Sequence, residues 1–298
     1  MSGEKTPQEA GAELERIYEE ALRLEKAGER EAAAAAWREV LALDAPGMCG
    51  AAVRLAALGV EASPEIAPPA YVTTLFDQHA DDFDEILVGR LGYRMPEALA
   101  ERLREVQGLP PAPKTLDLGC GTGLVGVALA GWPSHLTGVD LSPNMLDAAD
   151  ERQIYDALYV GDAVSFLDAD GEDEDDEDSG PWDLIGAADV LPYLGDLAPR
   201  AAGCARCLTP GGLLALTTET LPPEEIGPRG WIVGAHQRVH HDPAYVARTL
   251  EAQGLAVERM EPATIRYNEG RPEPGHIVFA RFSTLRDADG IDVRTSSS

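Results

Sequence analysis

The stretch LDLGCGTGLVG, residues 116–126, decides the fold. Its first residues are typical of a short buried strand, and the apolar run that begins at Leu124 is typical of a helix. Glycines between a strand and a helix let the backbone turn sharply and approach a ligand where any Cβ would collide. The start of the helix also offers backbone N–H groups that have no partner inside the helix. The sequence therefore predicts a ligand-binding turn at residues 119–123.

Outward from this turn, strand patterns and helix patterns alternate from Lys114 to Phe282. Such alternation is typical of a parallel, doubly wound sheet with helices on both faces. Two apolar stretches near the C-terminal end favour a late antiparallel pair. The expected strands are 115–120, 135–142, 158–163, 182–191 and 213–219, followed by 255–266 and 276–283 as the late pair.

Carboxylates mark the first three expected strands. Asp140 follows the glycines by about 20 residues, where a carboxylate can accept hydrogen bonds from both hydroxyls of a ribose. Residues 121–126 formally match the dinucleotide motif G-x-G-x-x-G, so a nicotinamide-dependent dehydrogenase is one interpretation. Asp117 inside the first strand and Asp162 at the end of the third favour a different nucleoside cofactor.

Five segments, taken in order, resemble the motif set of class I S-adenosylmethionine-dependent methyltransferases. They are LDLGCGTG, GVDLSPNML, GDA, DLIGAADVLPYL and LTPGGLLALTTE, and the resemblance covers roughly residues 71–282. It implies a doubly wound, mostly parallel, seven-stranded Rossmann-like sheet, with S-adenosylmethionine (SAM) as cofactor and S-adenosylhomocysteine (SAH) as product. With its N-terminal helices, the whole chain resembles a bacterial family of methyltransferases that carry tetratricopeptide repeats.

The resemblance implies a role for individual residues. Asp117 would bind the ammonium group of SAM directly or through water, Asp140 would bind the ribose hydroxyls, and Asp162 would accept from the adenine amino group. Leu141 and Met145 would pack on the adenine. The other residues that the resemblance places at the cofactor are Gly119, Cys120, Gly121, Gly123, Ala163 and Ala187.

The segment FDQHADDFD, residues 76–84, resembles the helix that precedes the core in many small-molecule methyltransferases. A sulfonium cation is attracted to aromatic faces and carboxylates. Phe76 and Tyr71 are therefore predicted to close over the cofactor as part of a lid, with Phe83 and Tyr93 as further candidates. The alternative is that Phe76 and Phe83, seven residues apart on one helix face, are core residues only.

Three residues are predicted to act on the methyl acceptor: Asp189, Tyr193 and His241. Asp189 and Tyr193 follow the fourth strand, where the resemblance places the substrate. His241 is expected at the start of a helix after the fifth strand, and its imidazole, with an ordinary pKa near 6.5, can remove a proton from an attacking atom. A surface or capping role is the alternative for His241. Further candidates, which the sequence does not rank, are Glu219, Arg238 and Tyr245.

The predicted function is transfer of a methyl group from SAM to O, N or S of a small-molecule acceptor by direct displacement. The alternative is a non-catalytic SAM-binding protein that uses its N-terminal helices to bind a partner. The segment WREVLALDAP, 37–46, and the helix that follows resemble about one and a half tetratricopeptide repeats. Because about three repeats are needed for a stable solenoid, these helices are expected to pack on the core, on a second copy or on a protein partner.

Composition narrows the partners further. The 298-residue chain has 24 basic and 52 acidic residues, a net charge of −28, which disfavours binding to nucleic acid or to anionic membranes. No stretch reaches the roughly 18 apolar residues of a membrane span, and the first residues lack a secretory signal, so a cytoplasmic location is expected. Cys204 and Cys207 form one C-x-x-C pair without the further ligands of a zinc site, so no metal is predicted.

The predicted organisation has four parts. They are a repeat-like helical domain at 1–62, linker and lid helices at 63–112, the methyltransferase core at 113–283, and a C-terminal tail at 284–298. Within the core, residues 168–180 form an acidic segment with nine acids between Asp168 and Asp178, which is expected to be a solvated loop because like charges repel.

Overall fold

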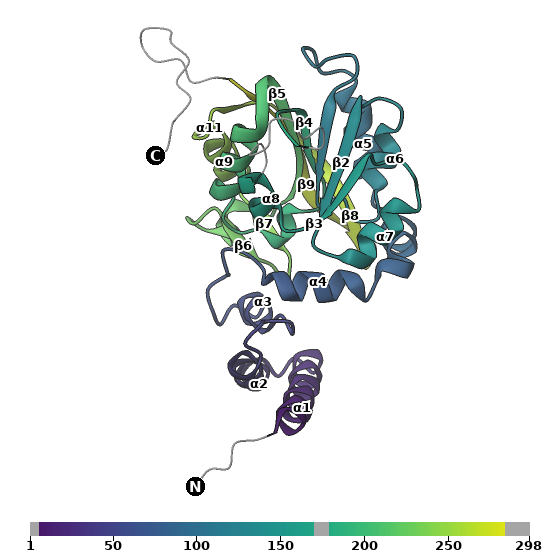
Figure 1. Cartoon of the computed structure of the whole chain (residues 1–298). Coiled ribbons are helices and arrows are strands. Elements are labelled where there is room, and N and C mark those ends of the chain that lie inside the picture. The colour runs from purple at the N-terminus through teal and green to yellow at the C-terminus, as the bar shows by residue number, and fades with distance from the viewer. Residues whose placement is uncertain (1–5, 170–178, 284–298) are drawn as a thin grey trace, which may run out of the picture.

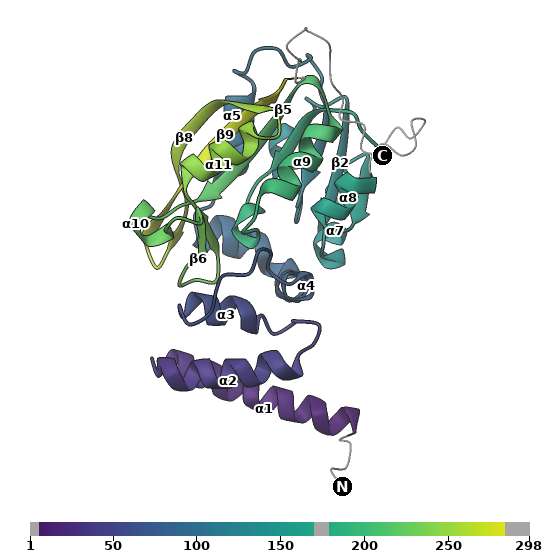
Figure 2. The same cartoon turned by 90° about the vertical axis from the view of Figure 1, so that its left-hand side faces the viewer.

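The computed structural model describes residues 6–169 and 179–283. Most of the predicted acidic loop, and the predicted C-terminal tail from 284, therefore lie outside the described residues. Three helices come first: α1 (Pro7–Lys26), α2 (Arg30–Leu43) and α3 (Ala51–Ala57). They form a separate layer beneath α4 (Pro69–Asp77) and the sheet (Figures 1 and 2).

The N-terminal helices begin and end where local chemistry favours it. Thr6 caps α1, because its side chain accepts from the backbone N–H of Glu9 while the Glu9 carboxylate accepts from the Thr6 backbone N–H. Trp37 is fully buried among apolar residues of all three helices. The relation of these helices to tetratricopeptide repeats stays a prediction.

Seven strands form the central sheet in the order β3-β2-β1-β4-β5-β9-β8. The first five are parallel, and β9 runs antiparallel to both β5 and β8. This confirms the predicted seven-stranded, mostly parallel sheet with a late antiparallel pair. The strands are β1 (Lys114–Leu118), β2 (His135–Asp140), β3 (Ala157–Val160), β4 (Trp182–Ala187), β5 (Leu208–Glu219), β8 (Leu255–Asn268) and β9 (Arg271–Phe282).

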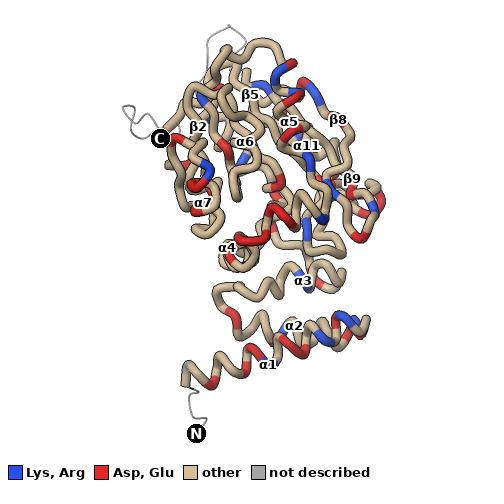
Figure 3. The backbone as a smooth tube through the Cα atoms, turned by 90° about the vertical axis from the view of Figure 1, so that its right-hand side faces the viewer, with Lys and Arg blue, Asp and Glu red and all other residues tan. Residues whose placement is uncertain are grey.

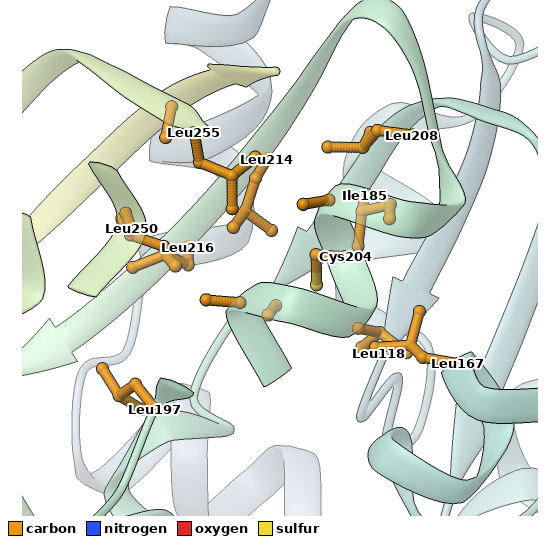
Figure 4. Close-up of a cluster of buried hydrophobic side chains, with 14 of the residues drawn as sticks. Leu118, Leu167, Ile185, Leu197, Cys204, Leu208, Leu214, Leu216, Leu250 and Leu255 are labelled. Carbon is orange, nitrogen blue, oxygen red and sulfur yellow. The ribbon is translucent and has the colours of Figure 1, made fainter. Parts of the chain in front are cut away.

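Helices cover both faces of this sheet (Figure 1). One face packs on α5 and α6, the other on α8, α9 and α11, and α7 packs beside β2 and β3. Figure 4 shows the core on the second face, where Cys204 of α9 lies among leucines of β1, β5 and α11. These helices are α5 (Met95–Leu103), α6 (Leu124–Leu129), α7 (Pro143–Asp150), α8 (Ala163–Ala169), α9 (Ala198–Cys207) and α11 (Pro243–Glu251).

A small hairpin, β6 (Trp231–Val233) and β7 (Val239–His241), precedes α11, with the short helix α10 (Pro223–Ile226) before it. His240 and His241 lie in β7 rather than in the start of α11, which corrects their predicted position. The hairpin pairs Trp231 with His241, so the two histidines belong to a strand, and Asp242 caps the helix instead.

The lid segment also differs from the expected single helix. After α4 ends at Asp77, the chain forms a 3₁₀ turn at Ala80–Asp82 and a π-helix at Glu85–Arg90. Phe76 and Phe83 therefore do not share one helix face, although their rings meet edge to face with centroids 5.8 Å apart. Aspartate is a weak helix former, and several aspartates in this segment bond to other elements instead.

The strand order reverses beside β1. The chain passes from β1 to β2 on one side, and β4 later pairs with the other side of β1. In open α/β sheets, ligands bind at such a switch point, in the crevice outside the carboxyl ends of the strands. Among the residues of 6–169 and 179–283, no helix is long and apolar enough to cross a bilayer.

Candidate functional site

A large pocket opens at the switch point. It contains about 1010 Å³ of empty space, counted out to the solvent at its mouth. Its wall is formed by the segments after β1, β2, β3 and β4 and by the lid segment that precedes α5. Ten of the predicted site residues line it: Phe76, Gly119, Cys120, Gly121, Asp140, Leu141, Asp162, Ala163, Asp189 and Tyr193.

The glycine turn forms the pocket wall next to β1. Gly119 has φ +67° and Gly121 has φ +54°, in the left-handed region that strongly favours glycine. A Cβ on Gly119 would also lie 2.4 Å from Cγ2 of Val190, so the segment after β4 packs directly on this turn. Gly123 lies one residue before α6, where it is the N-cap with φ +87°, and it does not line the pocket.

Asp140 connects the glycine turn to the loop after β2. Its Oδ2 accepts from the Gly121 N–H at 2.9 Å, and its Oδ1 accepts from the Ser142 N–H at 2.9 Å. Burial raises the pKa of Asp140, and the bonds from Ser142 and Gly121 oppose that rise. Carboxylate oxygens have further lone pairs, so Asp140 can still accept hydrogen bonds from a ligand in the pocket.

Asp162 lies at the end of β3, beside Ala163, on the same pocket. Its carboxylate accepts from the backbone N–H groups of Val164 and Ser165, which makes it the cap of α8. Burial acts to raise the pKa of Asp162, but the bonds from Ser165 and Val164 outweigh this and lower it. Asp162 therefore stays ionised and presents an acceptor at the pocket wall.

Asp117 lies beneath the pocket rather than on its wall, and it is 1 % exposed. Its Oδ2 accepts from the Tyr155 hydroxyl at 2.7 Å, while its Oδ1 is buried without a hydrogen-bond partner. The Tyr155 ring fills the space above Gly126 and Gly138, where any Cβ would lie 2.7 and 2.9 Å from it. Gly126 therefore has a packing role, and the match to the dinucleotide motif does not require a dinucleotide.

Burial raises the pKa of Asp117 to about 7, with Asp140 adding to the rise and the Tyr155 hydrogen bond opposing it. The folded state therefore binds this proton more tightly than the unfolded chain, whose aspartates titrate near 3.9. Stability supplied by the protonated form is fully present below about pH 4 and is lost as pH rises toward about 7.

We expect Asp117→Asn to remove this pH dependence. The amide oxygen still accepts from Tyr155 but carries no charge. The difference in free energy of unfolding, variant minus wild type, should therefore increase between about pH 5 and pH 7 and become constant above about pH 8. Urea unfolding at four pH values measures the difference. A difference that does not change with pH would show that Asp117 is not the titrating group.

Acidic residues hold the lid segment on the pocket. Figure 3 shows this segment as a run of red directly after α4. Asp77 accepts from the Ser142 hydroxyl at 2.5 Å, and Asp84 accepts from the Thr122 hydroxyl at 2.6 Å. Arg152 also donates to Asp84. The two carboxylates thus attach the lid to the loops after β2 and β1, the loops that carry Asp140 and the glycine turn.

Asp84→Ala should release a bound SAH faster. The change removes the Thr122 hydrogen bond and the Arg152 ion pair, and since Asp84 is 40 % exposed the loss is about 1 kcal/mol, or roughly fivefold in the dissociation rate. Stopped-flow displacement of SAH measures this rate. Asp82→Ala, an exposed carboxylate of the same segment, is the matched control. Equal rates for the two variants would contradict the role of Asp84.

The structure brings Asp189 and Tyr193 to the pocket but not His241. His241 is fully buried, with Nε2 3.3 Å from the Gly195 carbonyl oxygen and its ring stacked 6.2 Å from that of Tyr245. Burial lowers the pKa of His241 to about 4, so it is neutral at pH 7. A proton transfer by His241 to or from the acceptor stays a prediction that this geometry does not support.

Three other predicted cofactor residues lie off the pocket. Met145 is fully buried in the first turn of α7, and Ala187 faces a second, apolar pocket beneath α9. The Tyr71 ring covers Gly50, where a Cβ would lie 2.5 Å from it, so Tyr71 connects α4 to the N-terminal helices. None of the three lines the large pocket, and their role at the cofactor stays a prediction.

Several pocket residues carry no signal in the sequence. Thr122 lies within the glycine turn, but its bond to the lid depends on Asp84, a residue 38 positions away that no local pattern connects to it. Arg200 lines the pocket from α9, and burial lowers its pKa while Asp162 and Asp196 oppose that shift. No local pattern distinguishes this arginine from one on a solvated helix face.

The site fits SAM in size and in chemistry. Its volume exceeds that of a single nucleoside, its glycine turn leaves backbone close to the pocket, and Asp140 and Asp162 offer acceptors from successive strands. The buried Asp117 Oδ1 has no partner, which is costly unless a ligand or a water molecule completes its hydrogen bonds. The ammonium group of SAM, directly or through water, is a donor of that kind.

Comparisons with known proteins agree with this geometry. A family model described as "Methyltransferase domain" matches residues 116–214. The ubiquinone biosynthesis O-methyltransferase of Thiobacillus denitrificans is 30 % identical over 176 residues, which cover 55 % of this chain and 74 % of that enzyme. The biotin biosynthesis bifunctional protein BioCD of Bordetella avium is 35 % identical over 153 residues, 51 % of this chain and 30 % of that protein.

Coverage of the relatives varies. The chain spans only 30 % of the Bordetella avium protein and 41 % of a Xylella fastidiosa ubiquinone biosynthesis O-methyltransferase that is 32 % identical over 105 residues. Among solved structures, magnesium protoporphyrin IX methyltransferase from Synechocystis with bound SAM superposes with a TM-score of 0.54. The superposition covers 72 % of this chain and 97 % of that one, and at 16 % identity it shows the shared fold.

Three findings lead to one assignment: the match over most of the Thiobacillus denitrificans enzyme, the match to the methyltransferase family model, and the order of the strands in the sheet. The chain belongs to the class I S-adenosylmethionine-dependent methyltransferases, a family whose cofactor is SAM.

Proposed function

We propose that this protein transfers the methyl group of SAM to an oxygen, nitrogen or sulfur atom of a small-molecule acceptor. One observation carries the proposal: Asp140 braces the glycine turn at the switch point, and a large pocket lined by Asp162, Asp189 and lid aromatics opens beside it. The O-methyltransferases among the relatives make hydroxyl-bearing acceptors the first to test.

The cofactor residues have separate tasks in this proposal. Asp140 accepts from the ribose hydroxyls, Asp162 and Leu141 contact the adenine, and the backbone of Gly119–Gly121 borders the methionine part. Asp117 balances the ammonium group from beneath the turn. When bound, SAM supplies an activated methyl group on a positively charged sulfur, and the attacking nucleophile takes that methyl group while the sulfur leaves as a neutral thioether.

The lid residues exclude water from the reacting atoms. Phe76, Phe83 and Tyr93 line the pocket, and Phe76 meets Tyr193 edge to face with ring centroids 5.3 Å apart. An enclosed apolar wall strips water from a nucleophile and holds it in one orientation, and for a displacement on an activated methyl group this accounts for much of the acceleration.

The competing function is a SAM-binding protein without turnover, in which residues 1–62 bind a partner or a second copy. Leu41, Leu43 and Met48, near the end of α2, are exposed apolar side chains that such a partner would cover. Loss of methyl-labelled SAM in the presence of an acceptor distinguishes turnover from mere binding. Light scattering of the full chain measures whether it forms a dimer.

The experiment that tests the cofactor is calorimetry with SAH and with NADH on the full chain. We expect one SAH bound per chain, a raised melting temperature with SAH, and neither effect with NADH. Binding of NADH in place of SAH would overturn the proposal and favour the dehydrogenase interpretation of the glycine motif. A methyl-transfer screen with labelled SAM against phenols, amines and thiols then identifies the acceptor class.

A further inference from the structure

Asp189 has an unusual backbone conformation at the edge of the pocket. Its φ is +61°, a left-handed value that is uncommon outside glycine and is tolerated best by aspartate and asparagine. The Asp189 N–H donates to the Thr217 hydroxyl at 3.0 Å, and its side chain is 13 % exposed. Strained backbone persists only where neighbouring contacts hold it, and such positions cluster at functional sites.

Arg238 holds Asp189 from behind the pocket wall. Its guanidinium, on the β6–β7 hairpin, is 6 % exposed and donates to Oδ1 of Asp189. It also donates through Nε to Glu219 Oε1 at 2.9 Å and through Nη1 to the Tyr193 hydroxyl at 3.0 Å. A planar guanidinium spreads its donors over a fixed fork and can hold these three partners in one arrangement, a geometry that the compact ammonium of lysine does not reproduce.

Charge is balanced within this buried group. Arg238 and Arg266 both face Glu219, with Arg266 Nε 3.5 Å from Glu219 Oε1. The positive charges of the two arginines therefore balance the negative charges of Glu219 and Asp189. Arg238 occupies only Oδ1 of Asp189, and Asp189 also lines the pocket. The second carboxylate oxygen, Oδ2, is thus the one available to a molecule in the pocket.

Asp189 is also close to the cofactor side of the site. Val190, the next residue, packs on Gly119 so tightly that a Cβ there would lie 2.4 Å from Val190 Cγ2. Among the described residues that line the pocket, Arg200 is the one cationic side chain, and it faces Asp162 and Asp196 rather than Asp189. The acceptor end of the pocket therefore combines apolar walls with one carboxylate and no cation of its own.

We propose that Oδ2 of Asp189 accepts the hydrogen on the acceptor's reacting atom and that Arg238 is the positioning residue for Asp189. The acceptor is an uncharged or cationic alcohol, phenol or amine with an apolar body. This inference rests on the proposed function. As the acceptor's oxygen or nitrogen bonds to the methyl carbon, its proton passes to Oδ2, while the carbon–sulfur electron pair stays on sulfur. An anionic acceptor is disfavoured, because Asp189 would repel it.

The test compares two ligands that bind without turnover. Sinefungin differs from SAH in carrying an amine-bearing carbon in place of the sulfur, so its ammonium stands where the methyl group of SAM and the reacting atom meet. Asp189 should bind this ammonium with a charge-assisted hydrogen bond, and sinefungin should bind the wild-type chain about tenfold more tightly than SAH. Calorimetry on the full chain measures both dissociation constants.

Asp189→Asn is the decisive variant, because asparagine keeps the shape and also tolerates the left-handed backbone. We expect its affinity for SAH to stay within about threefold of wild type and the preference for sinefungin to fall below about threefold. Asp147→Asn, an exposed carboxylate on α7, controls for the change in net charge and should keep the full preference. A preference that survives in Asp189→Asn would overturn the proposal.

Arg238→Lys tests the positioning role. A lysine keeps the positive charge but cannot hold Asp189, Tyr193 and Glu219 together, so SAH binding should persist while the sinefungin preference drops by more than about threefold. An unchanged preference would show that Arg238 does not position Asp189.

The wild-type chain separates failure of the proposed cofactor from failure of this inference. If it binds neither SAH nor sinefungin, the proposed cofactor fails. If it binds both equally, the cofactor stands and this inference fails.

Discussion

Asp140→Ala should weaken SAH binding by about 1–3 kcal/mol, equivalent to roughly 5- to 150-fold in the dissociation constant. Two losses add up in this variant. In the proposed binding mode the ligand loses a carboxylate that accepts from its ribose, and the protein loses the bonds to Gly121 and Ser142, each 2.9 Å long, that hold the two loops in register. Isothermal calorimetry with SAH measures the change.

Two further variants separate these contributions. Asp140→Asn keeps one acceptor oxygen without the charge and should lose less affinity than the alanine variant. Asp147→Ala removes an exposed carboxylate from the helix that follows and should leave the dissociation constant unchanged. Wild-type affinity in Asp140→Ala would exclude Asp140 from the cofactor site.

Trp37→Ala should unfold the N-terminal helices while the sheet stays folded. Trp37 is fully buried, its Nε1 donates to Glu25 at 2.7 Å, Tyr18 packs edge to face at 5.5 Å, and Arg54 covers its ring at 4.9 Å. Truncating a buried tryptophan costs about 3–5 kcal/mol, which exceeds what a core built from three short helices can lose.

Hydrogen exchange resolves the outcome by region. We expect α1 and α2 to lose protection in Trp37→Ala, β1 and β4 to keep it, and SAH to bind with wild-type affinity. Arg38→Ala, on the same helix, removes only an exposed ion pair to Glu61 and should change nothing. Simultaneous loss of protection in helices and sheet would show that residues 6–57 and the sheet unfold as one cooperative unit.

The fold was predictable because its signals are local. Alternating strand and helix patterns, the glycine turn at 119–123 and the carboxylate about 20 residues later are all readable along the chain, and each depends on backbone geometry within one β-α unit. The same holds for Asp162 and for the antiparallel pair near the C-terminus. The boundaries were less predictable: β5 begins at Leu208 rather than at 213, since pairing with β4 extends it.

Some of the predicted site residues do not line the pocket, and their placement has one cause. His241 and Met145 stand at suitable positions in the sequence, yet both are fully buried because packing between layers decides where a side chain points. The lid segment was identified, but its break into short helical turns follows from bonds between Asp84 and Thr122 and between Asp77 and Ser142. Those partners lie 38 and 65 positions apart.

The class of sheet and the position of the glycine turn could be predicted from the amino-acid sequence, since both follow from periodicity and spacing within single units, whereas the proposed cofactor roles of the three aspartates come from the resemblance to the methyltransferase motif set. The folded structure was needed to show that Asp117 lies beneath the pocket on Tyr155 and that Arg238 holds Asp189, 49 residues away in the chain. A buried charge is stable only beside partners that balance it, and distant elements supply those partners. The arrangement around Asp189 is therefore a property of the folded chain.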